Sequence, residues 1–499
     1  MKKYYFFATG CSHWFDVAKV LHQDGVASPI FWLGDDRNYK KVCDYFGNGV
    51  AVRMNDYVHR PWRLNNIEYD GDSSEFFFSE NYIRAKDRCL KMMDRLDLYG
   101  LFTRLDREIY FNKLTITFLA KLKNSYPDAL IMVDSPHSHA QYLLYEICQF
   151  FHIPMAKFNS LAMLVPGLIL ENITKNTIVE NSLPVPNDIA DRIDMTISNY
   201  VSSTVEKAKS GDYELHYIKK QRQQHKWWAR LYSMLTAGSV MQYKASKSQL
   251  GMWLRREYNP VNPHNIGPLG RYRYEHSRRK NIRNNCFKYK DSPDLDKTFV
   301  YFALHYEPER TTNPDGGVFH DQIIAMVALR RFVPDNVEIV VKEQPTQFYE
   351  RHRGHRGRSP LIYNLIKNIK GVRFLGPFEN SVELQKKCVF VATITGSIAI
   401  EAAVLGKKTI MFGRTWFSGC PNTIAWDDCT DYQHLLDQKI SDSNEVLKFL
   451  LDLRKRFSVV GYQNISLEKR YADYGDDEFY RYQRDGISGL LKTYFDNLS

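Results

Sequence analysis

The sequence lacks any long uncharged apolar segment. No stretch reaches the roughly 18 residues that a membrane-spanning helix requires. The N-terminus is short and basic and then apolar, but its apolar run is shorter than that of a signal peptide, and no small-residue cleavage site follows. Tyr4–Thr9 instead has the pattern of a first strand. We therefore expect a cytoplasmic protein.

Paired cysteines and metal-binding motifs are also missing. The eight cysteines include no CxxC pair, and no cluster of histidines accompanies Cys420 and Cys429. Two DxD patterns, Asp70-Gly71-Asp72 and Asp294-Leu295-Asp296, do not clearly follow a strand. These absences argue against a disulfide framework, a structural zinc and a metal site, so we expect free thiols and no metal cofactor.

Internal repeats and low-complexity runs are absent too, and nothing in the sequence resembles a long disordered tail. The composition, with 44% apolar and 14% aromatic residues, is that of a folded protein. At 499 residues the chain is too long for a single core, so two or three domains are expected.

Positive charge is concentrated in one segment. The formal net charge is +11, but residues 216–290 hold 17 Lys/Arg against two acids, a net of +15, which leaves −4 for the rest. The segment also contains Trp227, Trp228 and Trp253. This composition fits a surface of anionic lipid headgroups, an anionic glycan or lipid-pyrophosphate acceptor, or a merely basic linker. No motif for RNA or DNA binding accompanies it, so we expect no nucleic acid partner.

The segment 389–416 carries the most information. Val389–Ala392 reads as a buried strand, followed by the hydroxyl-rich turn Thr393–Ser397. A helix is predicted from Ile398 to Leu405, ended by Gly406, and a second strand from Lys408 to Phe412. A turn at a helix N-terminus offers amide donors to a phosphate or carboxylate. Glu401, one helical turn below, could accept hydrogen bonds from a ribose.

Three further strands are predicted in the same region. Thr298–Leu304 runs into His305 and Glu307, Val337–Val341 runs into Lys342-Glu343-Gln344-Pro345, and Gly371–Leu375 ends at Gly376-Pro377. In open α/β sheets, ligands bind at the carboxyl ends of the strands. Residues 295–430 therefore predict a Rossmann-like domain with an anionic ligand across its strand ends.

The N-terminal part predicts a second unit of this kind. Its strongest strand, Ala129–Val133, runs into the polar segment 134–139. Asp134 could serve there as a base or nucleophile, and His137 or His139 as a base or phosphate donor. A helix cap and a packed turn are the alternatives for these residues. Ser12-His13 and Asp35-Asp36 are weaker candidates.

The organisation that follows is an α/β, GT-B-like fold, in which two Rossmann-like domains face a central cleft. We expect an N-terminal acceptor domain (1–184), a basic and mainly helical linker or insertion (185–292) broken by Pro and Gly near 260–270, a C-terminal nucleotide-sugar domain (293–455) and a tail (456–499). A helix over Asp485–Leu498 could pack back on the N-terminal domain. Glycosyltransferases and UDP-sugar 2-epimerases share this fold, which alone cannot separate them.

The C-terminal motifs resemble those of the capsule polysaccharide synthesis family, which includes bacterial Kdo transferases. Ala303–Glu307 takes the place of a Pro-Leu-Gln-like turn, and Lys342–Pro345 that of the motif Lys-x-His-Pro. The remaining motifs of the family follow in the same order along the chain, as the Ser/Thr turn 393–397, Glu401 and Gly406–Thr409. The resemblance covers 295–430 well and 130–155 loosely. Gln344 departs from the motif His and cannot protonate a leaving group, and Gly396 is expected to loosen the turn.

The resemblance implies a metal-independent glycosyltransferase that moves Kdo or a related ulosonic acid from a CMP-sugar onto a bacterial surface polysaccharide or its lipid-linked precursor. Lys342, Gln344, Thr395 and Ser397 would hold the donor phosphate, with Glu401 on the ribose or base. The whole set implied for donor binding is His305, Glu307, Lys342, Glu343, Gln344, Pro345, Thr395, Gly396, Ser397 and Glu401. The catalytic group would come from Asp134, His137 or His139.

Three alternatives stay open at this point. The donor could be a UDP- or GDP-sugar, the chain could be a UDP-N-acetylglucosamine 2-epimerase-like isomerase, or it could be a non-catalytic polysaccharide-assembly protein. For a transferase, the expected partners are a nucleotide-sugar donor and a glycan or glycolipid acceptor. The basic segment 216–290 would then hold the enzyme at the cytoplasmic face of a bacterial inner membrane.

Overall fold

The computed structural model describes residues 1–7, 13–34, 36–58, 71, 74–95, 97, 102–160, 166–170, 187–210, 264, 266–309, 311–349, 354–455, 459–460 and 476–498. Of the sequence predictions, Ser12, Asp35, Asp70, the three tryptophans of the basic segment and residues 216–263 lie outside these ranges.

The C-terminal sheet is wholly parallel, with the strand order β12-β11-β10-β7-β8-β9. Read from the other edge, the order is β9-β8-β7-β10-β11-β12. The chain therefore builds the sheet outward from β7 in one direction and then from β10 in the other, which is the doubly wound Rossmann arrangement. The strands are β7 (Phe299–Ala303), β8 (Glu338–Lys342), β9 (Val372–Leu375), β10 (Val391–Thr393), β11 (Thr409–Met411) and β12 (Thr423–Ala425).

The N-terminal sheet follows the same rule over five parallel strands and then adds two antiparallel ones. Its order is β13-β6-β5-β4-β1-β2-β3. The strands are β1 (Lys2–Phe7), β2 (Ala27–Gly34), β3 (Ala51–Arg53), β4 (Ala129–Met132), β5 (Met155–Ser160), β6 (Pro166–Leu170) and β13 (Val459–Val460).

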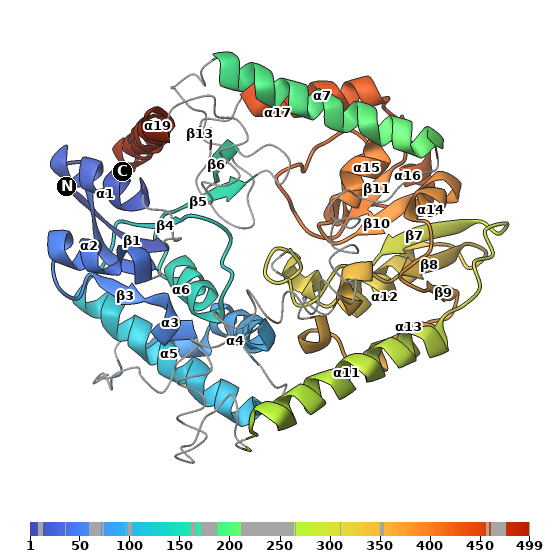
Figure 1. Cartoon of the computed structure of the whole chain (residues 1–499), viewed down its shortest axis with the longest axis horizontal. Helices are drawn as coiled ribbons and strands as arrows, with labels where there is room; N and C mark the ends of the chain where they lie inside the picture. The colour runs from blue at the N-terminus through green and yellow to red at the C-terminus, as the bar shows by residue number, and fades with distance from the viewer. Residues whose placement is uncertain are drawn as a thin grey trace.

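Helices cover the two sheets, which lie on opposite sides of the molecule (Figure 1). The N-terminal unit contains α1 (His13–Gln23), α2 (Asp36–Phe46), α3 (Met54–Val58), η2 (Ser74–Phe78), α4 (Glu80–Met92), η3 (Met93–Arg95), α5 (Arg104–Asn124) and α6 (His139–Phe150). The C-terminal unit contains η4 (Gly317–His320), α12 (Gln322–Phe332), η5 (Pro345–Phe348), η6 (Gly354–Arg356), α13 (Leu361–Lys367), α14 (Ser381–Lys387), α15 (Ile398–Val404), η7 (Trp426–Asp428), α16 (Tyr432–Asp437) and α17 (Ser443–Lys455).

Two long helices from the segment 185–292 are built into the C-terminal unit. α7 (Asn187–Ser210) buries Ile193 and Ile197 against α15 and α17, and α11 (Pro268–Tyr289) buries Ile282 and Cys286 in the core that contains β7 and β8. A bidentate ion pair between Arg454 and Asp194 joins α7 to α17. The described parts of this segment therefore pack as layers of the C-terminal unit.

The C-terminal tail returns to the N-terminal unit. β13 pairs with β6, and α19 (Asp476–Asp496) packs against α1 (Figure 1). Its buried side chains, among them Ile487, Leu490 and Leu491, join the cluster that surrounds Trp14 and Trp32. This apolar burial ties the end of the described chain to its beginning.

The α/β fold class with two Rossmann-type sheets is confirmed, and most strand ends differ from the predicted ones by one or two residues. The helix α11 begins at Pro268, within the region 260–270 where Pro and Gly were predicted to interrupt the segment. Pro268 occupies the first helical position behind Gly267, where a missing N–H costs nothing. Asp321 caps α12 by accepting a hydrogen bond from the amide of Ile323.

No helix in the described parts of the chain is both long enough and apolar enough to span a membrane.

Candidate functional site

Each sheet has one point where the chain reverses its direction of winding, and ligands of α/β sheets bind outside the strand ends at such a switch point. In the C-terminal sheet this point lies between β7 and β10. The residues just beyond those two strands are His305 and the turn Thr393–Ser397. In the N-terminal sheet it lies between β1 and β4, and Asp134 follows β4. Both sets of residues proposed from sequence thus begin at switch points.

His305 links the two strands of the C-terminal switch point. The amide of Thr395 donates to His305 Nε2 at 3.3 Å, and Thr393 Oγ1 lies 2.9 Å from the same nitrogen. Because an amide can only donate, Nε2 must be the accepting nitrogen and the neutral ring carries its proton on Nδ1. Burial, and secondarily the nearby Arg358, lower the pKa of His305 to about 4. The ring is therefore neutral at physiological pH and presents an N–H group at Nδ1.

The Ser/Thr turn is packed tightly rather than loosened by its glycine. A Cβ on Gly396 would lie 2.7 Å from Thr393 Oγ1 and 3.4 Å from the ring of His305. The hydroxyl of Thr395 donates to the carbonyl of Thr311, which ties the turn to the loop after β7. The expectation that Gly396 loosens the turn was wrong, because glycine is the residue that lets the turn approach His305.

Lys342 ends β8, beside β7, and is 7% exposed. Burial lowers the pKa of its ammonium group to about 8, against the partly compensating charges of Glu343 and Glu379. Among the described residues we find no hydrogen bond or ion pair to this ammonium group. A buried cation without a close counter-ion is costly, and an anionic ligand would reduce that cost.

Glu343 is a structural residue that holds the end of β8 in place. It is fully buried and accepts hydrogen bonds from Arg358 at 3.0 Å, from the Tyr363 hydroxyl at 2.9 Å and from the amide of Gln344 at 2.8 Å. Arg358 also donates to the carbonyl of His305 at 2.6 Å. This carboxylate and guanidinium therefore join the ends of β7 and β8. Gln344 and Pro345, which follow, are half-buried.

The loop after His305 is held by two glutamine side chains. Gln347 accepts from the amide of Glu307 and donates to its carbonyl, each at 2.9 Å. Gln322 donates to the Glu307 carboxylate at 3.0 Å and accepts from the amide of His305 at 2.8 Å. The position of Glu307 is therefore fixed by the protein itself, and its side chain is largely buried.

The remaining donor-side residues differ in their access to solvent. Ser397 is exposed, whereas Glu401 is 5% exposed. Burial raises the pKa of Tyr301 on β7, and the charges of Cys388 and Glu401 add to that rise, so Glu401 lies close to this phenol. Glu401 therefore lies beneath the turn, on the face of the sheet covered by α15.

The N-terminal switch point combines Asp134, Ser135 and a lysine that the sequence reasoning missed. Asp134 and Ser135 are buried, and the amide of Ser135 donates to Asp134 Oδ1 at 2.8 Å. Lys157, on β5 and 4% exposed, donates to the Ser135 hydroxyl at 3.0 Å. The site thus has a buried acid and a buried cation at adjacent strand ends.

The two candidate histidines have different settings. His137 is exposed, and its Nδ1 lies 2.9 Å from the carbonyl of Ser135. His139 is 1% exposed at the start of α6, with its ring 5.2 Å from that of Tyr110. The helix begins at Ser138, which forms a capping box with Gln141. His137 is the more accessible of the two.

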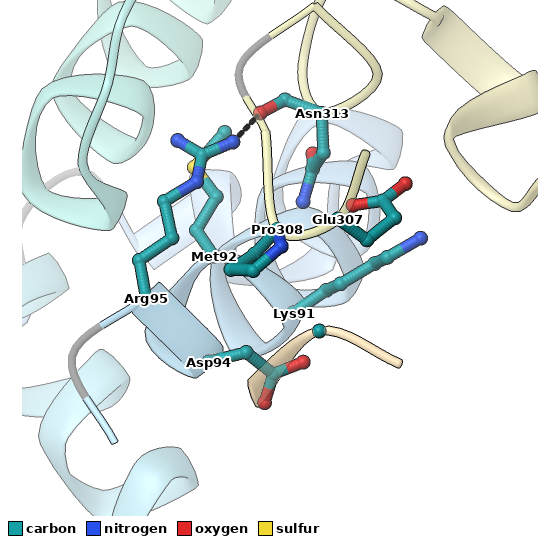
Figure 2. A pocket seen from close by; sticks show the side chains of 8 residues that line it. Lys91, Met92, Asp94, Arg95, Glu307, Pro308 and Asn313 are labelled. Carbon is teal, nitrogen blue, oxygen red and sulfur yellow. Dashed lines mark hydrogen bonds between the residues drawn. The ribbon is translucent and has the colours of Figure 1, made fainter. Parts of the chain in front are cut away.

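Arg95, which the sequence reasoning also missed, connects the two switch points. Its guanidinium donates to the carbonyl of His137 at 2.6 Å and to the carbonyl of Asn313 in the loop after β7 (Figure 2). Asn313 in turn donates to the carbonyl of Arg88 at 3.2 Å. Arg95 and Glu307 also line a small pocket at this junction (Figure 2). The strand-end loops of the two units therefore meet at this junction, and Arg95 bonds to both of them.

No signal in one sequence would have singled out these additional residues. Arg95 lies in a helical stretch, Lys157 in a short strand, and Arg358 in a loop, each at a distance from any motif. Within the described residues, no group of three or more His, Cys, Asp or Glu side chains could hold a metal ion.

No protein-family description and no curated protein matches the chain. Solved structures that resemble it include the UDP-GlcNAc 2-epimerase from Neisseria meningitidis bound to UDP-GlcNAc, with 12% identity over the full length of both chains and a TM-score of 0.22. Two others are the KpsC beta Kdo 2,7 and beta Kdo 2,4 transferases from Thermosulfurimonas dismutans.

The first transferase shows 11% identity over 71% of this chain and 90% of its own, and the second 13% over 65% and 87%, both with a TM-score of 0.24. At such scores the likeness carries no argument about this chain. Its fold class rests on the order of its own strands.

Proposed function

We propose that the protein is a metal-independent glycosyltransferase that transfers a sugar from a nucleotide-sugar donor to a glycan or glycolipid acceptor. The observation that carries the proposal is the meeting of two Rossmann-type switch points across Arg95. One offers a buried cation and neutral hydrogen-bond donors, and the other offers a buried carboxylate. Donor and acceptor would occupy opposite sides of this junction.

The donor phosphate would bind at the C-terminal switch point. Lys342 would supply the positive charge, and the His305 Nδ1–H, Gln344 and the hydroxyls of Thr395 and Ser397 would supply hydrogen bonds. These groups could stabilise the charge that develops on the leaving phosphate. Because Gln344 cannot protonate a leaving group, departure would depend on this stabilisation. Glu401 would reach the ribose or base only if the turn above it moves.

The acceptor hydroxyl would be activated at the N-terminal switch point. Asp134 is the candidate base, or the nucleophile if the reaction passes through a covalent adduct. His137 is exposed beside it, and Lys157 would orient Ser135 and the turn. The most specific form of the proposal, which rests on the motif resemblance, is a CMP-activated donor carrying Kdo or a related ulosonic acid.

The first test is a thermal-shift comparison of CMP, CDP, UDP and GDP, without metal and then with Mg²⁺. A ligand that binds only the folded state at 100 times its Kd stabilises that state by about 2.7 kcal/mol. Stabilisation by CMP without metal would support a Kdo-type donor and justify a transfer assay with CMP-Kdo. Stabilisation by UDP would favour a UDP-sugar transferase or an epimerase. No shift with any nucleotide would contradict the donor site.

Two variants test the roles proposed for Asp134 and Lys342. Asp134→Asn should abolish transfer while nucleotide binding persists, because the two functions lie in different sheets. Lys342→Met should weaken nucleotide binding itself. If both variants retain wild-type transfer, Asp134 and Lys342 do not have these roles. If the wild type itself transfers no sugar, the chain is better described as a non-catalytic assembly protein.

A further inference from the structure

The helix α11 presents a basic stripe to solvent. Arg273, His276, Lys280, Arg283 and Phe287 recur at helical spacing and are all exposed. We call these five residues the α11 stripe. The helix runs along the periphery of the molecule (Figure 1).

The charge of this helix is one-sided. Its one acidic residue, Glu275, is turned inward and forms ion pairs with Arg279 and with Arg356 of η6. Ile282 and Cys286 bury the same inward side in the C-terminal core. The stripe itself therefore contains no carboxylate, and its positive charge is not neutralised from within the helix.

An exposed aromatic pair lies at the end of the stripe. Phe287 is 40% exposed and stacks on Phe378, which is 64% exposed, with ring centroids 6.3 Å apart. Arg283 lies 5.8 Å from the centroid of the Phe287 ring. Two large apolar rings beside arginine and lysine are unfavourable in water, but they suit the headgroup region of a bilayer, where rings and aliphatic stems enter and charges stay at the surface.

We propose that the α11 stripe and Phe378 bind the surface of an anionic lipid bilayer. Positive side chains near a negatively charged leaflet each strengthen binding, and the aromatic pair adds apolar contact that a purely electrostatic partner would not need. The proposal concerns a face of α11 and not the nucleotide site, so it stands or fails independently of the proposed transferase activity.

The test is co-sedimentation of the whole protein with vesicles of equal parts phosphatidylglycerol and phosphatidylcholine, compared with pure phosphatidylcholine. The wild type should bind only the anionic vesicles, and added salt should release it. Reversing three cations, Arg273→Glu, Lys280→Glu and Arg283→Glu, should weaken binding by about 100-fold, since each contributes about fivefold.

A matched reversal of three exposed lysines elsewhere, Lys40→Glu, Lys41→Glu and Lys448→Glu, should leave binding close to wild type. Phe287→Ser with Phe378→Ser should weaken it without changing net charge, and circular dichroism would show that each variant folds. Wild-type binding by the stripe variant, as expected if residues 216–263 carry the lipid contact, would overturn the proposal. So would binding of the wild type to single-stranded RNA or heparin but not to anionic vesicles.

Discussion

At the scale of single residues, Lys342 is a buried cation whose pKa of about 8 lies well below the ordinary 10.5. At pH 7, below both values, the charged group destabilises the folded state by at most about 3 kcal/mol. This penalty is lost as pH rises from 8 to 10.5, because the folded protein releases its proton first. A bound anion would offset this loss of folding free energy.

We therefore expect Lys342→Met to raise the free energy of unfolding by about 1–3 kcal/mol at pH 7 while reducing nucleotide affinity at least tenfold. Urea unfolding and calorimetric titration with CMP would measure the two effects. Lys370→Met, at a side chain that is 90% exposed, is the control and should change neither. A destabilised Lys342→Met that binds nucleotide normally would contradict this account.

His305 predicts a response to acid. Its pKa is about 4 in the folded protein, against 6.5 ordinarily, so between these values the unfolded chain binds a proton that the folded chain does not. The free energy of unfolding should therefore fall as pH decreases through this window, by up to about 3 kcal/mol.

In His305→Gln this part of the acid sensitivity should disappear, since an amide oxygen can accept the Thr395 N–H without titrating. Urea unfolding at several pH values between 4 and 7 would then show a smaller change in the free energy of unfolding with pH for His305→Gln than for the wild type. The exposed His434→Gln variant should retain the wild-type slope. Equal slopes in all three proteins would mean that His305 is not held neutral.

At the scale of elements, the turn after β10 has no space for a larger residue at its glycine. Gly396→Ala would bring a methyl group to 2.7 Å from Thr393 Oγ1. We expect a loss of about 1–3 kcal/mol of stability and weaker nucleotide binding, because the turn must move away from His305. Adding Thr393→Ala removes the contacting oxygen, so the double variant should regain part of the stability in urea unfolding. If the double variant lost as much stability as the two single variants together, the contact between the added methyl group and Thr393 Oγ1 would not be the cause.

The helix α19 is an integral part of the N-terminal core. Leu490 is 1% exposed within the cluster around Trp14, so Leu490→Ala should cost about 2–5 kcal/mol. Urea unfolding followed by circular dichroism would measure the loss. Lys40→Ala, at an exposed side chain of α2, is the control and should cost little. An unchanged midpoint for Leu490→Ala would mean that α19 is dispensable.

The order of these elements was largely predictable from sequence, because the buried parts of parallel strands, such as Ile339–Val341, are apolar runs bounded by polar residues. Side-chain partnerships were not. The hydrogen bond between Thr395 and His305 joins residues 90 positions apart, and the contact of Arg95 with Asn313 spans 218. One sequence carries no record of such distant pairs, so the motif residues could be proposed while Arg95, Lys157 and Arg358 could not.

At the scale of the whole molecule, Arg95 is one of several side chains that join the two units, beside Asn313, which donates to Arg88, and His320, which pairs with Asp87. Arg95→Met should leave nucleotide binding intact, because its guanidinium bonds the carbonyls of His137 and Asn313 and not the donor-side side chains, but should lower the transfer rate and increase the radius of gyration in solution scattering. Arg104→Met, at a side chain that is 85% exposed, is the matched control. Weaker nucleotide binding together with an unchanged radius would contradict a joining role.

The return of the tail to the first sheet has a consequence for synthesis. The later part of α19, from Ile487 to Phe495, supplies side chains to the core around Trp14 and Trp32, and residues 459–460 pair with β6. The N-terminal unit cannot complete this core while the ribosome is still translating the C-terminal sheet. Folding of the first unit must therefore wait for the second, and a nascent chain stalled near residue 455 would expose the apolar face of β1 and α1 to chaperones.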